Sequence, residues 1–90
     1  MTRCAAMDLA KFKIRVNAVA PDITETPASY NHMRSINVSI EEGRKLFGSY
    51  SLLKRMSSPE EVANGVYFLA SDQSSFMTGE VMVMDGGRTL

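Results

Sequence analysis

The segment Ile14–Ala20, IRVNAVA, constrains the fold more than any other part of this 90-residue chain. It is rich in β-branched residues and almost continuously apolar, which is typical of a strand covered on both faces, as in a parallel sheet. Pro21 follows directly and lacks the N–H group that a β-ladder uses, so we expect the strand to end there. A chain with such a strand has two apolar faces to bury.

A capped helix and a second short strand complete the pattern. The run Ser58–Glu61 is a capping box with proline at the first helical position, and apolar residues then recur at helical spacing. This predicts a helix over Pro59–Ser71. The run Glu80–Met84, EVMVM, predicts a strand closed by Asp85–Gly87. Strand, helix and strand in this order form a βαβ unit, so we expect two parallel strands with a right-handed crossover.

Three further segments surround this unit. Alanine and leucine at helical spacing predict a helix over Thr2–Phe12, and because the pattern is already running at the first residue we expect the second half of a longer helix. A capping box predicts a helix over Ser39–Gly48. The polar stretch Pro21–Asn37 is interpreted as a loop with a helical turn at Asn31–Ser35.

The expected sheet is small for an independent protein. A single helix covers one face of a two-stranded parallel sheet, and chains of this size bury only about two-thirds of their unfolded surface. We therefore expect residues 1–90 to be the end of a larger domain.

The composition excludes several classes of function. Ten Lys and Arg residues offset ten Asp and Glu residues, which argues against nucleic acid or an anionic membrane as a partner. No apolar run approaches the ~20 residues that span a bilayer, and the charged amino terminus does not resemble a signal peptide. Cys4 is the single cysteine, so no intrachain disulfide can form, and no His and Cys cluster is available for a metal. We expect a cytoplasmic protein.

The loop Pro21–Thr26 is the best candidate for a functional site. It lies immediately beyond the carboxyl end of the first strand, where open α/β sheets bind ligands, and Thr24 and Thr26 supply hydroxyl groups. The alternative is an ordinary turn in which the threonines bond to local backbone. No glycine-rich loop of known phosphate-binding spacing is present.

The other reactive side chains have simpler explanations. His32 is expected to be a solvated loop residue and Cys4 a buried, unreactive thiol. The acid pairs Glu41–Glu42 and Glu60–Glu61 fall in first helical turns, where capping and the helix dipole account for them. The methionines of the last strand alternate with valines, which favours a core or a subunit contact.

Two long stretches carry a resemblance to a known family. They are KIRVNAVAPDITET and LLKRMSSPEEVANGVYFLASDQSSFMTGEVMVMDGG. In order and spacing they resemble the carboxyl-terminal part of a short-chain dehydrogenase/reductase, over the whole of this chain and the last third of a typical member. The resemblance implies an α/β, partial Rossmann fold with a carboxyl-terminal βαβ unit, preceded by half a helix and a lid. It also implies an oxidoreductase that uses NAD or NADP on an alcohol or carbonyl substrate.

The same resemblance implies roles for individual residues. Residues 21–50 would form the cofactor loop and the substrate lid, with Pro21, Asp22, Thr24 and Thr26 in the loop that receives the nicotinamide end of the cofactor. Backbone groups near Thr24 would hold the carboxamide, and Thr26 would bond to the carboxamide or the pyrophosphate. Asp22 departs from the family pattern, which usually has glycine. A positive φ there would strain an aspartate, and its carboxylate would disfavour a pyrophosphate.

The resemblance also implies what this chain lacks and what it pairs with. The family's phosphate loop and its catalytic Ser, Tyr and Lys would lie upstream, and no Tyr-x-x-x-Lys occurs here, so we expect no catalysis by this chain alone. Pro59–Ser71 and Glu80–Met84 match elements used for subunit pairing. Three interpretations stay open: the carboxyl-terminal portion of an oligomeric oxidoreductase, a non-catalytic short protein that pairs with a full-length dehydrogenase, and a stand-alone binding module.

Overall fold

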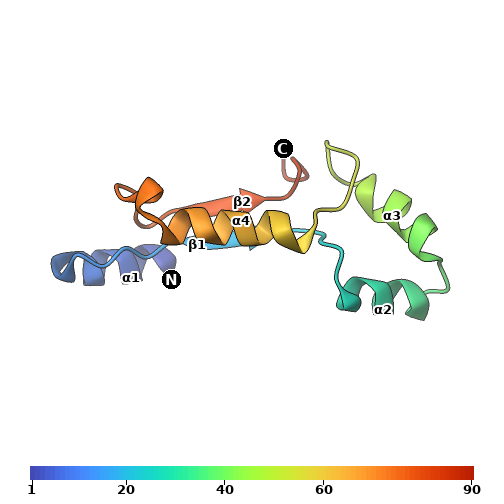
Figure 1. Ribbon diagram of the computed structural model, residues 1–90, viewed down its shortest axis with the longest axis horizontal. Coiled ribbons are helices and arrows are strands. Elements are labelled where there is room, and N and C mark those ends of the chain that lie inside the picture. The colour runs from blue at the N-terminus through green and yellow to red at the C-terminus, as the bar shows by residue number, and fades with distance from the viewer.

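The computed structural model describes residues 1–90 and has an elongated α/β architecture (Figure 1), with extents of 51 × 23 × 20 Å. The element order is α1 (Thr2–Leu9), η1 (Ala10–Phe12), β1 (Ala18–Pro21), α2 (Pro27–Ser35), α3 (Ile40–Gly48), α4 (Pro59–Ala70), η2 (Asp72–Ser74) and β2 (Val81–Met84). The strands and α4 form the middle, α1 lies at one end, and α2 and α3 form the other. None of the helices has the length and apolar character needed to cross a bilayer.

The two strands pair in parallel, as the sequence predicts. The register runs from Ala18 opposite Val81 to Pro21 opposite Met84. Pro21 therefore belongs to the strand as its last residue, and the ladder continues with the Asp22 N–H, which donates to the Met84 carbonyl at 3.2 Å. The expected start of the strand at Ile14 is wrong, because the strand begins four residues later.

The residues before β1 are held by side-chain bonds. The Arg15 guanidinium donates to the Ser74 hydroxyl at 3.1 Å and to the Met77 carbonyl at 3.2 Å. The Asn17 side chain donates to the Met77 carbonyl at 3.0 Å and accepts from the Glu80 N–H at 3.0 Å. These bonds link the approach to β1 with the turn that leads into β2, and they add to the backbone bond from the Gly79 N–H to the Val16 carbonyl at 2.7 Å.

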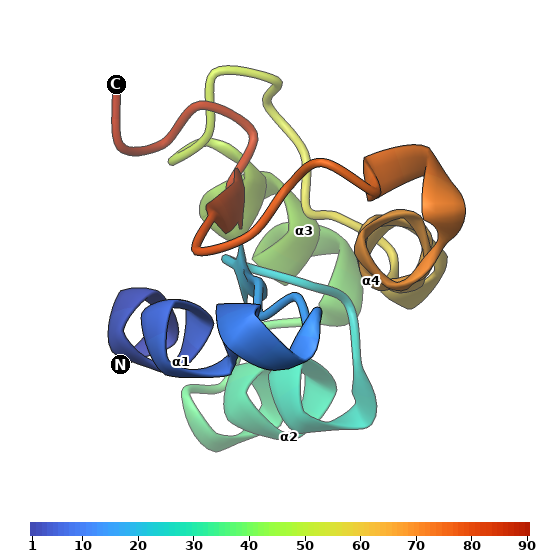
Figure 2. The same ribbon diagram turned by 90° about the vertical axis from the view of Figure 1, so that its left-hand side faces the viewer.

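Only one face of the sheet is covered by a helix of this chain. Gly65 of α4 lies so close to β2 that a Cβ there would be 2.5 Å from the Met84 sulfur. On the opposite face Val81 and Val83 are 44% and 55% exposed. Figure 2 shows α1 and α4 on opposite sides of the strands, but α1 lies beyond the end of the sheet in Figure 1. One face of the sheet is therefore open within residues 1–90, as expected for the end of a larger domain with one crossover helix.

The predicted loop after β1 contains a full helix instead. Thr26 is the N-cap of α2, with a capping box in which Ser29 is the reciprocal partner, and Pro27 takes the first helical position. The usual sequence signature has Glu or Gln as that partner, so this start signal was missed. Met33 of α2 is 1% exposed against Gly43 of α3 and joins the two helices. His32 accordingly lies on a helix and not in a loop, although it is exposed as expected.

The remaining helices agree with the predictions within a residue or so. Ser39 and Ser58 cap α3 and α4 by accepting from backbone N–H groups, and α1 continues into η1 over the expected range. Cys4 is a correction, because its thiol is exposed on α1 and not buried.

Candidate functional site at the carboxyl end of the strands

A pocket of about 290 Å³ opens where both strands end. Five segments contribute to it: the residues after β1, the end of α3, the chain between α3 and α4, the first turn of α4, and β2 with the turn that follows. Its apolar lining comes from Ile23, Phe47, Leu53, Val83 and Met84, and its polar lining from Asp22, Ser51, Arg55, Ser57, Glu61 and Asp85. The site therefore lies at the edge of the sheet that the sequence indicates, but most of its residues come from outside the predicted loop.

The four predicted cofactor-binding residues lie in different surroundings. Asp22 lines the pocket, whereas Pro21 is exposed at the end of β1. Thr24 is engaged with the chain before α4, and the Thr26 hydroxyl oxygen accepts from the Ser29 N–H at 3.3 Å as the cap of α2. The structure thus brings one of the four residues to the pocket wall and uses the two threonine hydroxyls within the chain.

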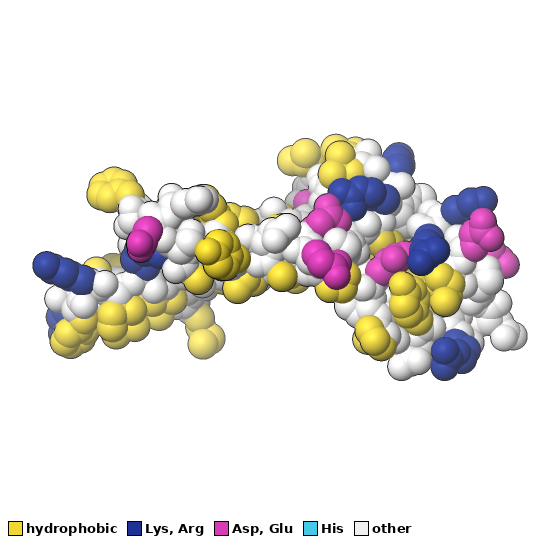
Figure 3. Space-filling model, in the orientation of Figure 1, with side chains coloured by type: hydrophobic (Ala, Val, Ile, Leu, Met, Phe, Trp, Pro, Cys, Tyr) yellow, Lys and Arg dark blue, Asp and Glu magenta, His cyan; other side chains and the backbone are white.

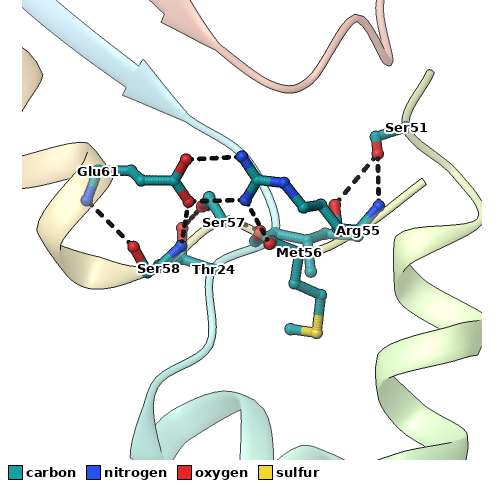
Figure 4. A network of polar contacts seen from close by, with 8 residues as sticks. Thr24, Ser51, Arg55, Met56, Ser57, Ser58 and Glu61 are labelled. Atoms are coloured by element: carbon teal, nitrogen blue, oxygen red, sulfur yellow. Dashed lines mark hydrogen bonds and ion pairs between the residues drawn. The ribbon is translucent and has the colours of Figure 1, made fainter. Parts of the chain in front are cut away.

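Ser57 holds the loop that follows β1. Its N–H donates to the Ile23 carbonyl at 3.0 Å, and its carbonyl accepts from the Glu25 N–H at 2.9 Å, which makes a short parallel bridge beside Thr24. The two hydroxyl oxygens of Thr24 and Ser57 lie 2.8 Å apart (Figure 4). The conformation of the predicted cofactor loop is therefore set by a residue 33 positions away.

An ion pair at the start of α4 forms one wall. Arg55 donates to both carboxylate oxygens of Glu61, each at 2.7 Å, and also to the Met56 carbonyl (Figure 4). Glu61 also accepts from the Ser58 N–H at 2.9 Å. The bonds from Arg55, followed by the backbone bond at Ser58, lower the pKa of Glu61 from 4.5 to about 2. Capping alone therefore does not account for Glu61, and the pair with Arg55 was missed in the sequence.

Asp22 is paired with a residue from the end of the chain. The Arg88 Nη1 lies 2.9 Å and 3.1 Å from the two carboxylate oxygens of Asp22, and the guanidinium carbon lies 5.8 Å from the centre of the Tyr50 ring. Asp22 is not among the residues with positive φ. The backbone strain expected for an aspartate at this position is therefore absent, and its charge has a partner.

The turn after β2 closes the pocket on one side. The Asp85 carboxylate accepts from the Gly87 N–H at 2.9 Å and from the Thr89 hydroxyl at 2.6 Å, and these bonds lower its pKa, with the Thr89 hydroxyl as the largest cause. The Gly86 carbonyl accepts from the N–H groups of Leu52 and Leu53. Gly86 has a φ of 61°, which glycine adopts without a Cβ penalty. This turn fastens the chain after α3 to the end of β2.

The helices α2 and α3 are tied to the loop by a polar cluster. Glu25 forms an ion pair with Arg44 of α3 and accepts from the Tyr30 hydroxyl at 3.4 Å. The His32 and Phe47 rings lie 5.8 Å apart between the two helices. Phe47 also lines the pocket, so α3 of the expected substrate lid contributes to the pocket wall, whereas α2 contributes no lining residue. No group of His, Cys, Asp and Glu is placed to hold a metal ion.

A βαβ unit with a pocket at the carboxyl ends of its strands is the arrangement of an open α/β ligand-binding domain. The sequence model of the family described as Enoyl-(Acyl carrier protein) reductase matches residues 1–89. The chain belongs to the short-chain dehydrogenase/reductase family, as its sequence resemblance indicates, and it corresponds to the carboxyl-terminal part of family members.

Individual relatives agree with this assignment. The chain is 42% identical over 88 residues to cyclopentanol dehydrogenase of Comamonas sp. strain NCIMB 9872, and 45% identical over 87 residues to the 3-oxoacyl-(acyl-carrier-protein) reductase FabG of Thermotoga maritima. These matches cover 98% and 97% of this chain but 33% and 32% of the relatives. The chain therefore spans about one third of the length of the curated relatives it matches.

Solved structures give the same result. A short chain dehydrogenase family protein of Francisella tularensis superposes with a TM-score of 0.88 at 39% identity, over 99% of this chain and 38% of that one. The aldohexose dehydrogenase of Thermoplasma acidophilum, in a carboxyl-terminal deletion mutant, has a TM-score of 0.91 at 34% identity over 98% and 40%. Both the fold class and the expected partial Rossmann architecture are thereby confirmed.

Proposed function

We propose that this chain forms the carboxyl-terminal part of an NAD(P)-dependent oxidoreductase that transfers hydride between the nicotinamide and a small alcohol or carbonyl substrate. The observation that carries the proposal is the pocket at the carboxyl ends of two parallel strands, with Phe47 of α3 in its lining. By its name the related cyclopentanol dehydrogenase acts on a small uncharged alcohol, which supports the proposed substrate class, whereas FabG by its name acts on an acyl group attached to a carrier protein. The cytoplasmic location expected from the sequence stays a prediction.

The residues of the pocket fit one end of the cofactor and not the other. An uncharged carboxamide needs hydrogen-bond donors and acceptors. Ser57 uses the backbone groups of Ile23 and Glu25, but the N–H and the carbonyl of Thr24 itself are not used by any hydrogen bond within the chain. A pyrophosphate needs positive charge, but the one cation in the lining, Arg55, is engaged with Glu61. We therefore assign the nicotinamide end to the loop after β1 and the pyrophosphate to residues outside this chain. When bound, the cofactor supplies or accepts the hydride.

The chain's own residues would act by positioning and by excluding water. The bridge between Thr24 and Ser57 fixes the loop that meets the nicotinamide, and the pocket's apolar lining keeps water from the substrate. A general acid for the carbonyl oxygen would come from the rest of the domain. On this proposal the chain alone binds and orients but does not turn over substrate.

Complementation tests the proposal. The part of the Comamonas cyclopentanol dehydrogenase that lies outside the match would be produced together with this chain, and NAD(P)H formation from cyclopentanol would be followed by absorbance. We expect activity from the pair and none from either part. A stable complex of the two parts without activity would contradict the proposal.

Variants at Thr26 separate its two expected roles. Thr26→Asn keeps an N-cap acceptor for α2 but removes the hydroxyl, whereas Thr26→Ser keeps both. If the hydroxyl bonds to the cofactor, Thr26→Asn raises the Michaelis constant for the cofactor in the complemented enzyme and Thr26→Ser does not. An unchanged constant in Thr26→Asn would contradict the assignment of Thr26 to the cofactor.

A second candidate function is pairing with a full-length dehydrogenase through residues 59–71 and 80–84. It is favoured by apolar side chains that face away from this chain's own core. Tyr67 of α4 is 75% exposed, and Val81 and Val83 are exposed on the open face of β2. Figure 3 shows the narrow middle of the molecule, where α4 and the strands lie with hydrophobic side chains at the surface. Homo-oligomerisation through the same elements is the corresponding proposal for the whole enzyme.

Co-purification distinguishes the second candidate. A tagged chain would be mixed with a purified full-length relative and analysed by size-exclusion chromatography with light scattering. We expect a complex that Tyr67→Lys disrupts, since a buried lysine at this position would have no partner. Asn31→Lys, on an exposed position of α2 and outside both pairing elements, is the matched control. Separate elution of the two proteins would contradict the pairing function.

A further inference from the structure

The charged groups around the pocket are paired with one another. Arg55 uses its two terminal nitrogens on Glu61, and Arg88 uses Nη1 on Asp22. Asp85 accepts bonds from the turn that follows it. Three carboxylates thus stand against two guanidinium groups, which leaves a net charge of −1 at neutral pH. No guanidinium in the lining of the pocket is free to receive an anion.

The hydroxyl groups in the lining are also engaged. The Ser51 hydroxyl donates to the carbonyl groups of Gly48 and Arg55, and the Ser57 hydroxyl bonds with Thr24 and the Ile23 carbonyl. The rest of the lining is apolar and contains one aromatic ring, Phe47. At about 290 Å³ the pocket is at the small end of the range for small-molecule sites, about 300–1,000 Å³.

We propose that Asp22 sets the charge selectivity of this pocket, so that it accepts a small uncharged or cationic ring compound and excludes anions. Asp22 is the carboxylate at the end of β1 itself, and 28% of its side chain is exposed. Arg88, its partner, lies over the Tyr50 ring and is not among the residues that line the pocket. A ligand in the pocket can therefore contact the Asp22 carboxylate directly, whereas the Arg88 guanidinium lies behind that carboxylate. The inference rests on the proposed function, because it names the substrate class of the same pocket.

The two partners of the ion pair have opposite effects on selectivity. Asp22→Asn removes a negative charge and leaves Arg88 without a partner, so the affinity of the pocket for an anion should rise. Arg88→Gln leaves the Asp22 carboxylate unpaired, so the affinity of the pocket for an anion should fall. One unit charge at about 6 Å in partly hydrated surroundings changes affinity roughly fivefold. If the ion pair only held the structure together, both substitutions would change the relative affinity for anions in the same direction, because each one breaks the same bonds.

Benzamide, benzamidine and benzoate test the proposal, because they have nearly the same shape and differ in charge. Each is titrated into the isotope-labelled chain, and dissociation constants are taken from the backbone NMR shifts of the lining residues. The titration needs neither cofactor nor turnover, so it can be interpreted even if the complementation experiment fails. If complementation succeeds and the charge series fails, only the inference about Asp22 falls.

We expect benzamide and benzamidine to bind more tightly than benzoate. The benzoate-to-benzamide ratio of affinities should rise roughly fivefold in Asp22→Asn and fall in Arg88→Gln at low salt, with smaller effects at high salt. Asp72→Asn in η2, which is outside the pocket, is the matched control and should leave the ratio unchanged. An unchanged ratio in Asp22→Asn, the same direction in both partner variants, or no response of the lining residues to any probe would overturn the proposal.

Discussion

Gly43 lies where α3 approaches α2 most closely, and a methyl group at this position would collide with Met33. A Cβ there would be 2.4 Å from Sδ, 2.6 Å from Cγ and 2.7 Å from Cε of Met33. Because Met33 is fully buried, its side chain has little room to turn away. We therefore predict that Gly43→Ala loosens the α2–α3 pair, which forms the lid side of the pocket.

The size of this effect follows from two opposing contributions. Alanine in place of glycine favours a helix by about 1 kcal/mol. Forcing an extra methyl group into a filled core typically costs about 1–3 kcal/mol. The free energy of unfolding should therefore fall by about 0–2 kcal/mol in Gly43→Ala. In a Met33→Ala background the collision is absent, and the same substitution should raise it by about 1 kcal/mol.

Urea unfolding followed by circular dichroism measures this double-mutant cycle. The four chains are the unchanged protein, Gly43→Ala, Met33→Ala and the double variant, and the expected coupling is about 1–3 kcal/mol. Asn64→Ala on the exposed side of α4 is the control, since it gains helix propensity without a collision. The reasoning is refuted if Gly43→Ala stabilises the unchanged protein as much as it stabilises Met33→Ala.

Three further predictions concern single residues. Because the folded-state pKa of Glu61 is about 2, below its ordinary 4.5, the stabilisation from its bonds to Arg55 and Ser58 is present above pH 4.5 and is lost as the pH falls towards about 2. The urea midpoint should drop less over this range in Glu61→Gln, and an equal drop in both proteins would contradict the assignment. Thr26→Ala removes the cap of α2 and should lower the free energy of unfolding by about 1 kcal/mol, with loss of helical circular dichroism, whereas Thr26→Asn should retain it. Cys4 is exposed, so its thiol should react with a disulfide reagent in the native chain nearly as fast as in urea; strong protection in the native chain would show that α1 is packed.

The elements with local signals were predicted correctly. The capping serines, the proline at the start of α4 and the apolar spacing define α3 and α4 without reference to distant residues. The alternation of Met82 and Met84 with valines indicated a strand, and its methionines do pack on α4 at Gly65. Parallel pairing followed from the order of strand, helix and strand. The helix α2 was missed because its capping partner is a serine, which is a weaker sequence signal.

A pocket lies beside the loop that the sequence proposes as a site, but of the four predicted residues only Asp22 lines it. The order of residues along the chain is enough to place the loop that contains Asp22 at the carboxyl end of β1. The partners of that loop come from far along the chain: Arg88 for Asp22 and Ser57 for Thr24. The assignment of Thr24 and Thr26 to a cofactor stays a prediction.

The amino-acid order by itself determined three of the four α-helices (α1, α3 and α4), the presence of both strands, their parallel pairing, and the family to which the chain belongs. The helices and strands depend on caps and apolar spacing within a few residues, and the family follows from the order of motifs along the chain. The tertiary structure decided which charges meet, which sheet face stays open and which loop residues reach the pocket. Such contacts depend on the distance between side chains from remote segments, and Asp22 and Arg88, 66 residues apart, have no local pattern that connects them.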